Sequence, residues 1–356
     1  MTPTPYPLTT TFYRQARHSP ILAAPKLKQG FAINPEVPMP FTVVNAEQTQ
    51  RLLPMNTCIA LMQTAMMAAS QGGADSPPRL ITPLPGPPAW LALMPGASAE
   101  LGCYGAKMVG LHPDNPKHGR PAVQGFVCLF NLDTGEPMGM VDGAAITAIR
   151  PAAASGLASR CLARPNARSC GIMGTGVQAI NHVEAMLAVR DVQEVIIWGR
   201  DFSKASALAA QLNSQHRCVV RATAEAAEAA ACDMVCTVTG SAEPVLKGEW
   251  VQPGAHINLV GAHSLTTREA DSALISQAAL YVDSMVSTRN EGGDIMIPLA
   301  EGTIDNGQIV GEIGALLNGD CVGRESDEAI TVYNSLGITA QDIYAADYVL
   351  KRALGA

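Results

Sequence analysis

A glycine-rich turn in the middle of the chain is the strongest chemical signal in the sequence. Residues 169–179 (Ser-Cys-Gly-Ile-Met-Gly-Thr-Gly-Val-Gln-Ala) lead from a short apolar run through Gly174 and Gly176 directly into a helical pattern. Gly174 permits the tight bend, Gly176 leaves the backbone open to a pyrophosphate, and Ala179 lets the helix pack close to the strand. Phosphates would bind the free N–H groups and positive end of the helix that begins near Val177. The pattern predicts a dinucleotide site, although such turns also occur as purely structural ones.

Arg200 follows the next predicted strand, residues 192–198. At this point the dinucleotide-binding fingerprint places an acidic residue that holds the ribose 2′-hydroxyl, whereas a guanidinium pairs with a 2′-phosphate. The sequence therefore predicts NADPH (NADP+) as the cofactor and NADH as the weaker one. The alternative interpretation of Arg200 is a solvated surface arginine.

The composition is that of a globular protein with room for two domains. The chain has 356 residues, of which 47% are hydrophobic and 15% charged. A net charge of −7 without basic runs argues against nucleic acid as a partner, and no apolar window approaches the roughly eighteen residues of a membrane span. The nine cysteines form no C-x-x-C pair and have no metal-ligand spacing, so we expect no metal, reduced thiols and a cytoplasmic location.

Two kinds of element pattern position these residues. Residues 169 to about 310 alternate strands with helices, which predicts a doubly wound parallel sheet followed by a C-terminal helical region that includes 330–350. Before the glycine turn, the patterns predict helices at 55–70 and 145–163 and strands around 90–94, 105–109, 124–131 and 137–142. The fold class is therefore α/β, a Rossmann domain joined to an α+β domain.

Residues 1–40 differ from the rest of the chain. They carry four Lys and Arg residues against the single acid Glu36, are rich in Thr and Pro, and lack the apolar stretch of a secretory signal. We expect an extension that packs on the surface or on a partner subunit. An organelle transit peptide is the alternative.

Five motifs in a fixed order resemble the ornithine cyclodeaminase/μ-crystallin family, closest to its ketimine reductase branch. They are Pro78-Arg79, Lys107 followed by His112-Pro113-x-Asn115, Thr147-Ala-Ile-Arg150-Pro, Gly174-x-Gly176-x-Gln178-Ala179 and Asn258-Leu-Val-Gly261. The resemblance implies a homodimer with a substrate-binding and dimerisation domain (41–160 plus about 315–356) and a Rossmann NADP-binding domain (161–314), after the extension 1–40. The cofactor-binding residues that we expect are Arg150, Gly174, Thr175, Gly176, Val177, Gln178, Ala179, Arg200, Thr237, Val260 and Ser335.

The resemblance also implies hydride transfer at a carbon that bears both a nitrogen and a carboxylate. Cationic side chains can hold such a carboxylate by charge-assisted hydrogen bonds and so orient the reacting carbon. Arg79 and Lys107 match the family's substrate-carboxylate residues, and Arg150 would lie between substrate and cofactor. Taken singly, Arg79 can be a solvated loop residue and Lys107 an edge-strand lysine.

Two departures from the family pattern narrow the chemistry. Cyclodeaminases of the family have an aspartate where this chain has His263, and a glutamate where it has Ala92. Both carboxylates that would meet a second, cationic amine are therefore absent, and an unpaired ammonium in a dry site costs several kcal/mol. Ornithine cyclisation is accordingly disfavoured.

We therefore predict reduction of a cyclic α-imino acid, Δ1-pyrroline-2-carboxylate to L-proline, with Δ1-piperideine-2-carboxylate to L-pipecolate as a second reaction. Lys107, His263 or water would donate the imine proton, since an imidazole titrates near neutral pH; a cap or core histidine is the alternative for His263. The alternatives in activity are an ornithine cyclodeaminase, an alanine or N-methylalanine dehydrogenase, and a non-catalytic NADPH-binding protein.

Overall fold

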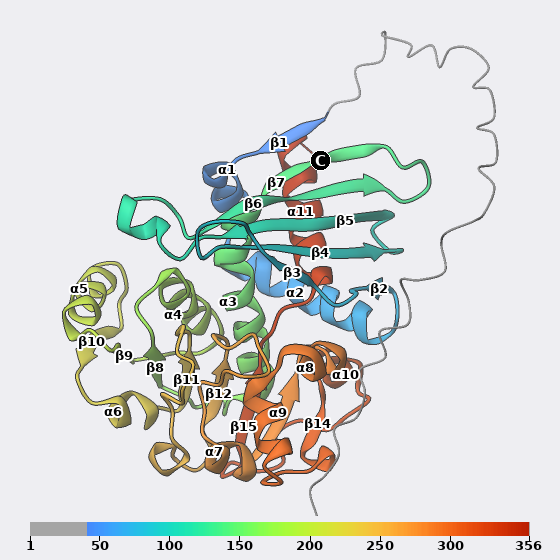
Figure 1. Ribbon diagram of the computed structural model, residues 1–356. Coiled ribbons are helices and arrows are strands. Elements are labelled where there is room, and N and C mark those ends of the chain that lie inside the picture. Colours follow the sequence, from blue (N-terminus) through green and yellow to red (C-terminus); the bar gives the residue numbers. More distant parts are fainter. Residues whose placement is uncertain (1–40, 356) are drawn as a thin grey trace, which may run out of the picture. The chain divides into compact units, whose positions relative to one another are not determined.

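The computed structural model describes residues 41–355, and the expectation for 1–40 lies outside them. The first of its two sheets has the order β1-β7-β6-β5-β4-β2, with β3 paired to β4 (Figure 1). Its strands are β1 (Thr42–Val44), β2 (Ala74–Asp75), β3 (Leu80–Pro83), β4 (Trp90–Ser98), β5 (Cys103–Leu111), β6 (Val123–Asn131) and β7 (Pro137–Asp142). All pairs except β1–β7 are antiparallel, which confirms the predicted α+β pattern of the first half.

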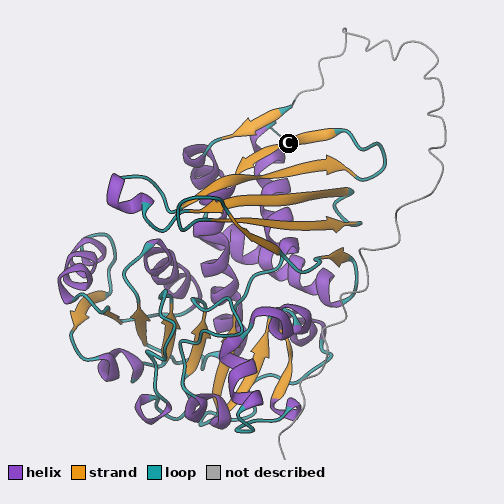
Figure 2. Ribbon diagram, viewed as in Figure 1, coloured by secondary structure: helices purple, strands orange, loops and turns teal. Residues whose placement is uncertain are grey.

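Helices cover one face of this first sheet (Figure 2). They are α1 (Ala46–Leu52), α2 (Met55–Ser70), α3 (Gly143–Leu162) and α11 (Thr339–Ala353). The strands alternate accordingly, since Cys103, Lys107 and Val109 of β5 are buried toward the helices whereas Tyr104 and Met108 are exposed on the opposite face. A lysine on the covered face is unusual and marks a site that must satisfy its charge.

The second sheet is entirely parallel, with the order β10-β9-β8-β11-β12-β15-β13-β14. Its strands are β8 (Ser169–Met173), β9 (Glu194–Trp198), β10 (Val219–Thr223), β11 (Met234–Thr237), β12 (His256–Leu259), β13 (Ala278–Val282), β14 (Ile309–Glu312) and β15 (Ile330–Asn334). The chain runs outward from β8 in one direction and from β11 in the other. This arrangement confirms the doubly wound sheet and places its switch point between β8 and β11, where such sheets bind ligands.

The remaining helices connect these strands. They are α4 (Val177–Val189), α5 (Phe202–Asn213), α6 (Ala226–Ala230), α7 (Ser272–Gln277), α8 (Met285–Glu291), α9 (Gly293–Ala300) and α10 (Ile313–Asn318), with short 3₁₀ turns at Asn115–His118, Gly248–Trp250 and Asn306–Gln308. Among the described residues, no helix alone has the length and hydropathy of a membrane span. Only the bent pair α1 and α2, at 82° to one another, satisfies both criteria together.

One element prediction was wrong. Residues 330–334 (Ile-Thr-Val-Tyr-Asn), expected in a helical region, form β15, which lies between β12 and β13. β-Branched and aromatic residues favour this buried position in a parallel sheet. The chain then turns at Ser335-Leu336-Gly337, and α11 packs against the first sheet (Figure 1, red). The described residues 41–355 belong to one compact unit, so the proposed division near residue 160 stays a prediction.

Candidate active site and cofactor cleft

The glycine turn between β8 and α4 has the geometry that a dinucleotide needs. Gly174 has a φ of +138°, and a Cβ there would lie 2.7 Å from the Val238 carbonyl oxygen. Gly176 caps α4 without a side-chain hydrogen bond, and a Cβ on it would meet none of the described atoms within 4 Å. The N–H groups at the start of α4 therefore face open space, as phosphate binding requires.

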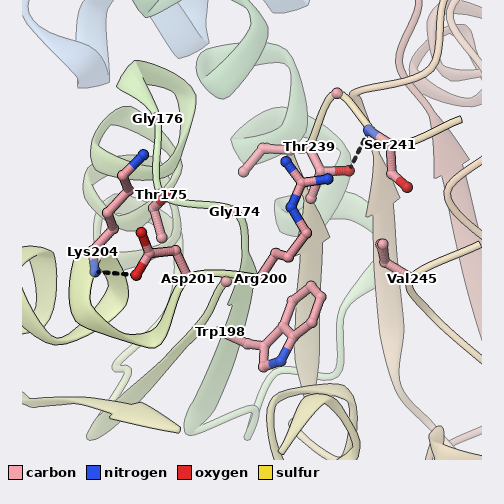
Figure 3. A pocket seen from close by; sticks show the side chains of 13 residues that line it. Gly174, Thr175, Gly176, Trp198, Arg200, Asp201, Lys204, Thr239, Ser241 and Val245 are labelled. Carbon is pink, nitrogen blue, oxygen red and sulfur yellow. Dashed lines mark hydrogen bonds between the residues drawn. The ribbon is translucent and has the colours of Figure 1, made fainter. Parts of the chain in front are cut away.

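This open space is a cavity of about 400 Å³ at the carboxyl ends of β8, β9 and β11 (Figure 3). The Arg200 side chain extends from the end of β9 toward Thr239, and Lys204 reaches in from the first turns of α5 (Figure 3). The neighbouring Asp201 caps α5 by accepting the backbone N–H of Ser203 at 3.0 Å and that of Lys204 at 3.4 Å. The two cations of the cavity are thus left without a side-chain ion pair within the described residues.

The predicted cofactor residues fall into three groups. Gly174, Thr175, Gly176 and Arg200 line the cavity. Val177, Gln178 and Ala179 open α4, where Gln178 Nε2 donates to the Thr147 carbonyl at 2.8 Å and the buried Ala179 packs against the core. Thr237, Val260 and Ser335 lie at or just beyond the carboxyl ends of β11, β12 and β15, on the same edge of the sheet. Sequence reasoning missed Lys204, Thr239 and Ser241, although Lys204 is signalled by its place four residues after Arg200.

The predicted cofactor-binding residues differ in whether their polar atoms already have hydrogen-bond partners. The Thr237 hydroxyl donates to Glu269 at 2.8 Å, and its carbonyl oxygen accepts the Val260 N–H at 3.0 Å, so neither group is free for a ligand. The buried Ser335 hydroxyl, in contrast, has no hydrogen-bond partner among the described residues, and neither does Gln178 Oε1. Buried polar atoms rarely stay unpaired, and these two fit a polar ligand such as a nicotinamide dinucleotide.

Lys107 and Arg150 converge on one buried carboxylate, Asp342 at the start of α11. Lys107 Nζ lies 3.0 Å from Asp342 Oδ1, and Arg150 Nε lies 3.2 Å from the same oxygen. Burial opposes ionisation of Asp342, but Arg150 and Lys107 hold its pKa below the usual value. Burial, with Arg150 adding to it, lowers the pKa of Lys107 to about 8, against the effect of Asp342. Lys107 is therefore charged at neutral pH yet able to release a proton.

Arg79 is held at one end of its guanidinium. Nη2 donates to the carbonyl oxygens of Leu336 at 2.6 Å and Gly337 at 2.8 Å, and it lies 2.9 Å from Glu291 Oε1. Within residues 41–355, Nη1 and Nε make no hydrogen bond, so the N–H groups of these two nitrogens are available to a carboxylate.

Arg79 also lines a second cavity of about 350 Å³. Its walls are Pro78, Arg79, Ile81, His263, Ser264, Leu265, Thr266, Ser287, Asn290 and Glu291. His263 is exposed in this cavity, with Nδ1 3.2 Å from the Gly261 carbonyl oxygen, so it is neither a helix cap nor a core residue. The protein atoms around the imidazole shield it from part of the solvent, and this desolvation is the main cause that lowers the pKa of His263. The positive charges of Arg79, Arg150 and Lys107 lower it further. Its neutral form therefore predominates at neutral pH.

Together the described residues form a nicotinamide-dinucleotide fold with a cationic site beside the cofactor edge. The sequence profile of the ornithine cyclodeaminase/mu-crystallin family matches residues 41–356, and the chain belongs to this family. The resemblance seen in the five motifs is thereby confirmed.

Several known proteins are similar to this chain in sequence and structure. A Δ1-pyrroline-2-carboxylate reductase of Bacillus cereus is 35% identical over 314 residues, which cover 88% of this chain and 96% of that protein. The structure of the Thermococcus litoralis Δ1-pyrroline-2-carboxylate reductase with NADH and L-proline superposes with a TM-score of 0.85 at 32% identity, covering 88% and 97% of the two chains. An archaeal alanine dehydrogenase dimer with bound NAD gives 0.82 at 31% identity, covering 88% and 96%.

Proposed function

We propose that this protein reduces a cyclic α-imino acid with NADPH, converting Δ1-pyrroline-2-carboxylate to L-proline and, as a second reaction, Δ1-piperideine-2-carboxylate to L-pipecolate. The observation that carries the proposal is the cation set: Arg79 has free Nη1 and Nε donors beside a cavity, while Lys107 and Arg150 share Asp342. The identity of the chain to pyrroline-2-carboxylate reductases over most of its length supports the same reaction.

Each residue of the site has a separate role in this proposal. When bound, the nicotinamide supplies the hydride. The free N–H groups of Arg79 hold the substrate carboxylate, and Arg150 lies between substrate and cofactor, which keeps the imine carbon at a fixed place. Lys107, with a pKa of about 8, is the proton donor to the imine nitrogen, because it holds its proton at neutral pH whereas His263 does not. His263 forms part of the cavity wall.

The absence of two carboxylates supports an imine without a second amine. Ala92 on β4 is half-buried and pairs with Val109, and His263 occupies the other position at which cyclodeaminases carry an acid. A ring of methylenes needs no counter-ion at either position. An ornithine ammonium would lack both partners.

NADPH rather than NADH fits the cleft because Arg200 and Lys204 bring two cations to the end of β9. The acid of this region, Asp201, accepts the N–H groups of its own helix. A 2′-phosphate would meet two cations here, whereas a 2′-hydroxyl gains little from them.

A homodimer would cover the open face of the first sheet. Tyr104 and Met108 are exposed there, and Tyr104 stacks on Phe130 of the next strand with ring centroids 5.3 Å apart. Leu93 pairs with Met108 on the same face, and Val43 is 60% exposed at its edge. A contiguous apolar face of this kind is typical of an interface, and a second copy of the chain is its occupant in our proposal. All nine cysteines are free thiols, which supports a cytoplasmic location.

The test follows NADPH oxidation with four substrates: the five-membered imine, the six-membered imine, pyruvate with ammonia, and pyruvate with methylamine. Turnover confined to the two rings supports the proposal. Turnover confined to pyruvate and an amine contradicts it and assigns the chain to the alanine dehydrogenase activity of its structural relative. No turnover with any substrate favours a binding protein.

A further inference from the structure

Gly337, in the turn between β15 and α11, contacts groups from three other parts of the chain. Its N–H donates to Asp283 Oδ2, and its carbonyl oxygen accepts from Arg79 Nη2. Its φ is +82°, and a Cβ at this position would overlap the Arg150 guanidinium. The turn Leu336-Gly337 is therefore the backbone element against which both arginines are placed.

We propose that Asp283 and Glu291 are positioning residues that orient the free N–H groups of Arg79 toward the substrate carboxylate. The inference rests on the proposed function, since it assigns Arg79 its ligand. Asp283 acts through the Gly337 turn, and Glu291 acts directly on Nη2. Asp283 is not expected to touch the substrate, and Glu291, although it lies in the wall of the cavity, acts in this proposal through Arg79.

The geometry of Asp283 supports an indirect role. It follows β13 directly, is 3% exposed, and uses one carboxylate oxygen for the Gly337 N–H, while Oδ1 has no partner among the described residues. By fixing Gly337, Asp283 also fixes the two successive carbonyl groups that accept from Arg79. Removing the carboxylate charge would loosen the turn without removing any donor to the substrate.

Glu291 completes the restraint from another direction. It is the last residue of α8 and is 8% exposed, and its Oε1 shares Nη2 with the two carbonyl oxygens. Three acceptors at one nitrogen restrict the orientation of the guanidinium. A guanidinium held in this way loses less side-chain entropy when it binds a carboxylate.

The test measures KM, kcat and the Kd of NADPH separately for Asp283→Asn and Glu291→Gln. We expect KM for Δ1-pyrroline-2-carboxylate to rise about tenfold or more, because a misplaced charged hydrogen bond is lost. The Kd of NADPH, measured by fluorescence titration, should stay within about twofold, since the cofactor cavity holds neither residue. Unchanged KM values in both variants, or an equal rise in the Kd of NADPH, would overturn the inference.

A double-mutant cycle separates positioning from general damage. In an Arg79→Ala background, Asp283→Asn should add little to KM, because its effect passes through Arg79; additive effects contradict the proposal. Asp233→Asn is the matched control, since Asp233 Oδ2 also accepts backbone N–H groups, from Arg168 at 2.8 Å and Ser169 at 3.0 Å, at the opposite edge of the sheet. It should lower stability and leave KM unchanged. If Asp283→Asn does not fold, the cycle with Glu291→Gln decides.

The order of measurements keeps the two proposals apart. If the wild-type protein does not reduce the cyclic imine, the proposed function fails. If the wild-type protein turns over normally but both variants keep its KM, the positioning role alone fails.

Discussion

Lys107 Nζ lies within 3.0 Å of both carboxylate oxygens of Asp342, a residue 235 positions later in the chain. The two side chains are 3% and 0% exposed, so the pair is almost free of solvent. Because Arg150 shares the same carboxylate, Asp342 sets the separation of the two cations. The C-terminal helix thus determines the charge arrangement on a strand of the first sheet.

Removing this carboxylate should destabilise the protein strongly. Asp342→Asn leaves two buried cations without a counter-charge, for which the expected loss in the free energy of unfolding is about 3–5 kcal/mol at pH 7. The pKa of Asp342 is lowered in the fold, so its stabilising effect is complete above the ordinary carboxyl pKa and is lost as pH falls through the lower folded value. Urea unfolding of both proteins at pH 7 and near pH 3 should show the difference shrinking in acid. A difference independent of pH contradicts this account.

The pH profile of imine reduction should report Lys107. As pH rises through about 8, the ammonium loses its proton and kcat/KM should fall. Lys107→Met should reduce kcat by about 10²–10⁴-fold and remove this alkaline limb. His263→Gln is the comparison variant and should keep both the wild-type kcat and the alkaline limb of the profile. If the alkaline fall of kcat/KM disappears in the His263 variant instead of the Lys107 variant, His263 is the proton donor.

Arg200→Asp should shift preference from NADPH toward NADH, because it places an acid where the 2′-phosphate would lie. The ratio of kcat/KM values for the two cofactors should change by about tenfold or more, the worth of a charged hydrogen bond. Lys204→Ala should move the ratio in the same direction by less. Arg217→Asp is the control, since it makes the same charge change at an exposed position outside the cavity. A ratio unaffected by Arg200→Asp contradicts the 2′-phosphate assignment.

Restoring both family acids should open the site to a diamine substrate. The double variant Ala92→Glu, His263→Asp supplies counter-ions for a second ammonium, and we expect ammonia release from ornithine and weaker reduction of the cyclic imine. Each single variant serves as the reference. If the double variant folds, binds NADPH and releases no ammonia, these two positions do not separate the activities.

A charge on the open face of the first sheet should prevent dimer formation. Met108→Glu buries a carboxylate in the proposed interface and should give monomers in sedimentation velocity. Val219→Glu, on the exposed edge strand β10 at 56% exposure, is the control and should leave the assembly of the wild-type protein unchanged. A monomeric wild-type protein contradicts the dimer proposal directly.

Local patterns were sufficient to predict the elements that carry the chemistry. The Gly174 turn, α4 and the hairpin of β6 and β7 follow from glycine spacing, helical periodicity and turn residues, all of which lie close together in the sequence. The partners of the cations could not be predicted in this way. Asp342, Glu291 and Asp283 reach Lys107, Arg79 and Gly337 only through tertiary structure, and an acid in a helix or after a strand is most often a solvated residue. The helical prediction for β15 failed for the same reason, because its strand character depends on burial between two neighbours.

The path of the last segment also bears on how the chain is made. Among the described elements, β15 and α11 come last in the chain, yet one completes the middle of the cofactor sheet and the other supplies Asp342 beneath the first sheet. During translation, Lys107 and Arg150 have no counter-ion until α11 has left the ribosome. Contacts so distant in sequence form slowly, and the emerging chain would expose apolar surface in the meantime. This site can therefore form only after α11 has emerged, which leaves chaperones that shield nascent chains a defined interval in which to act.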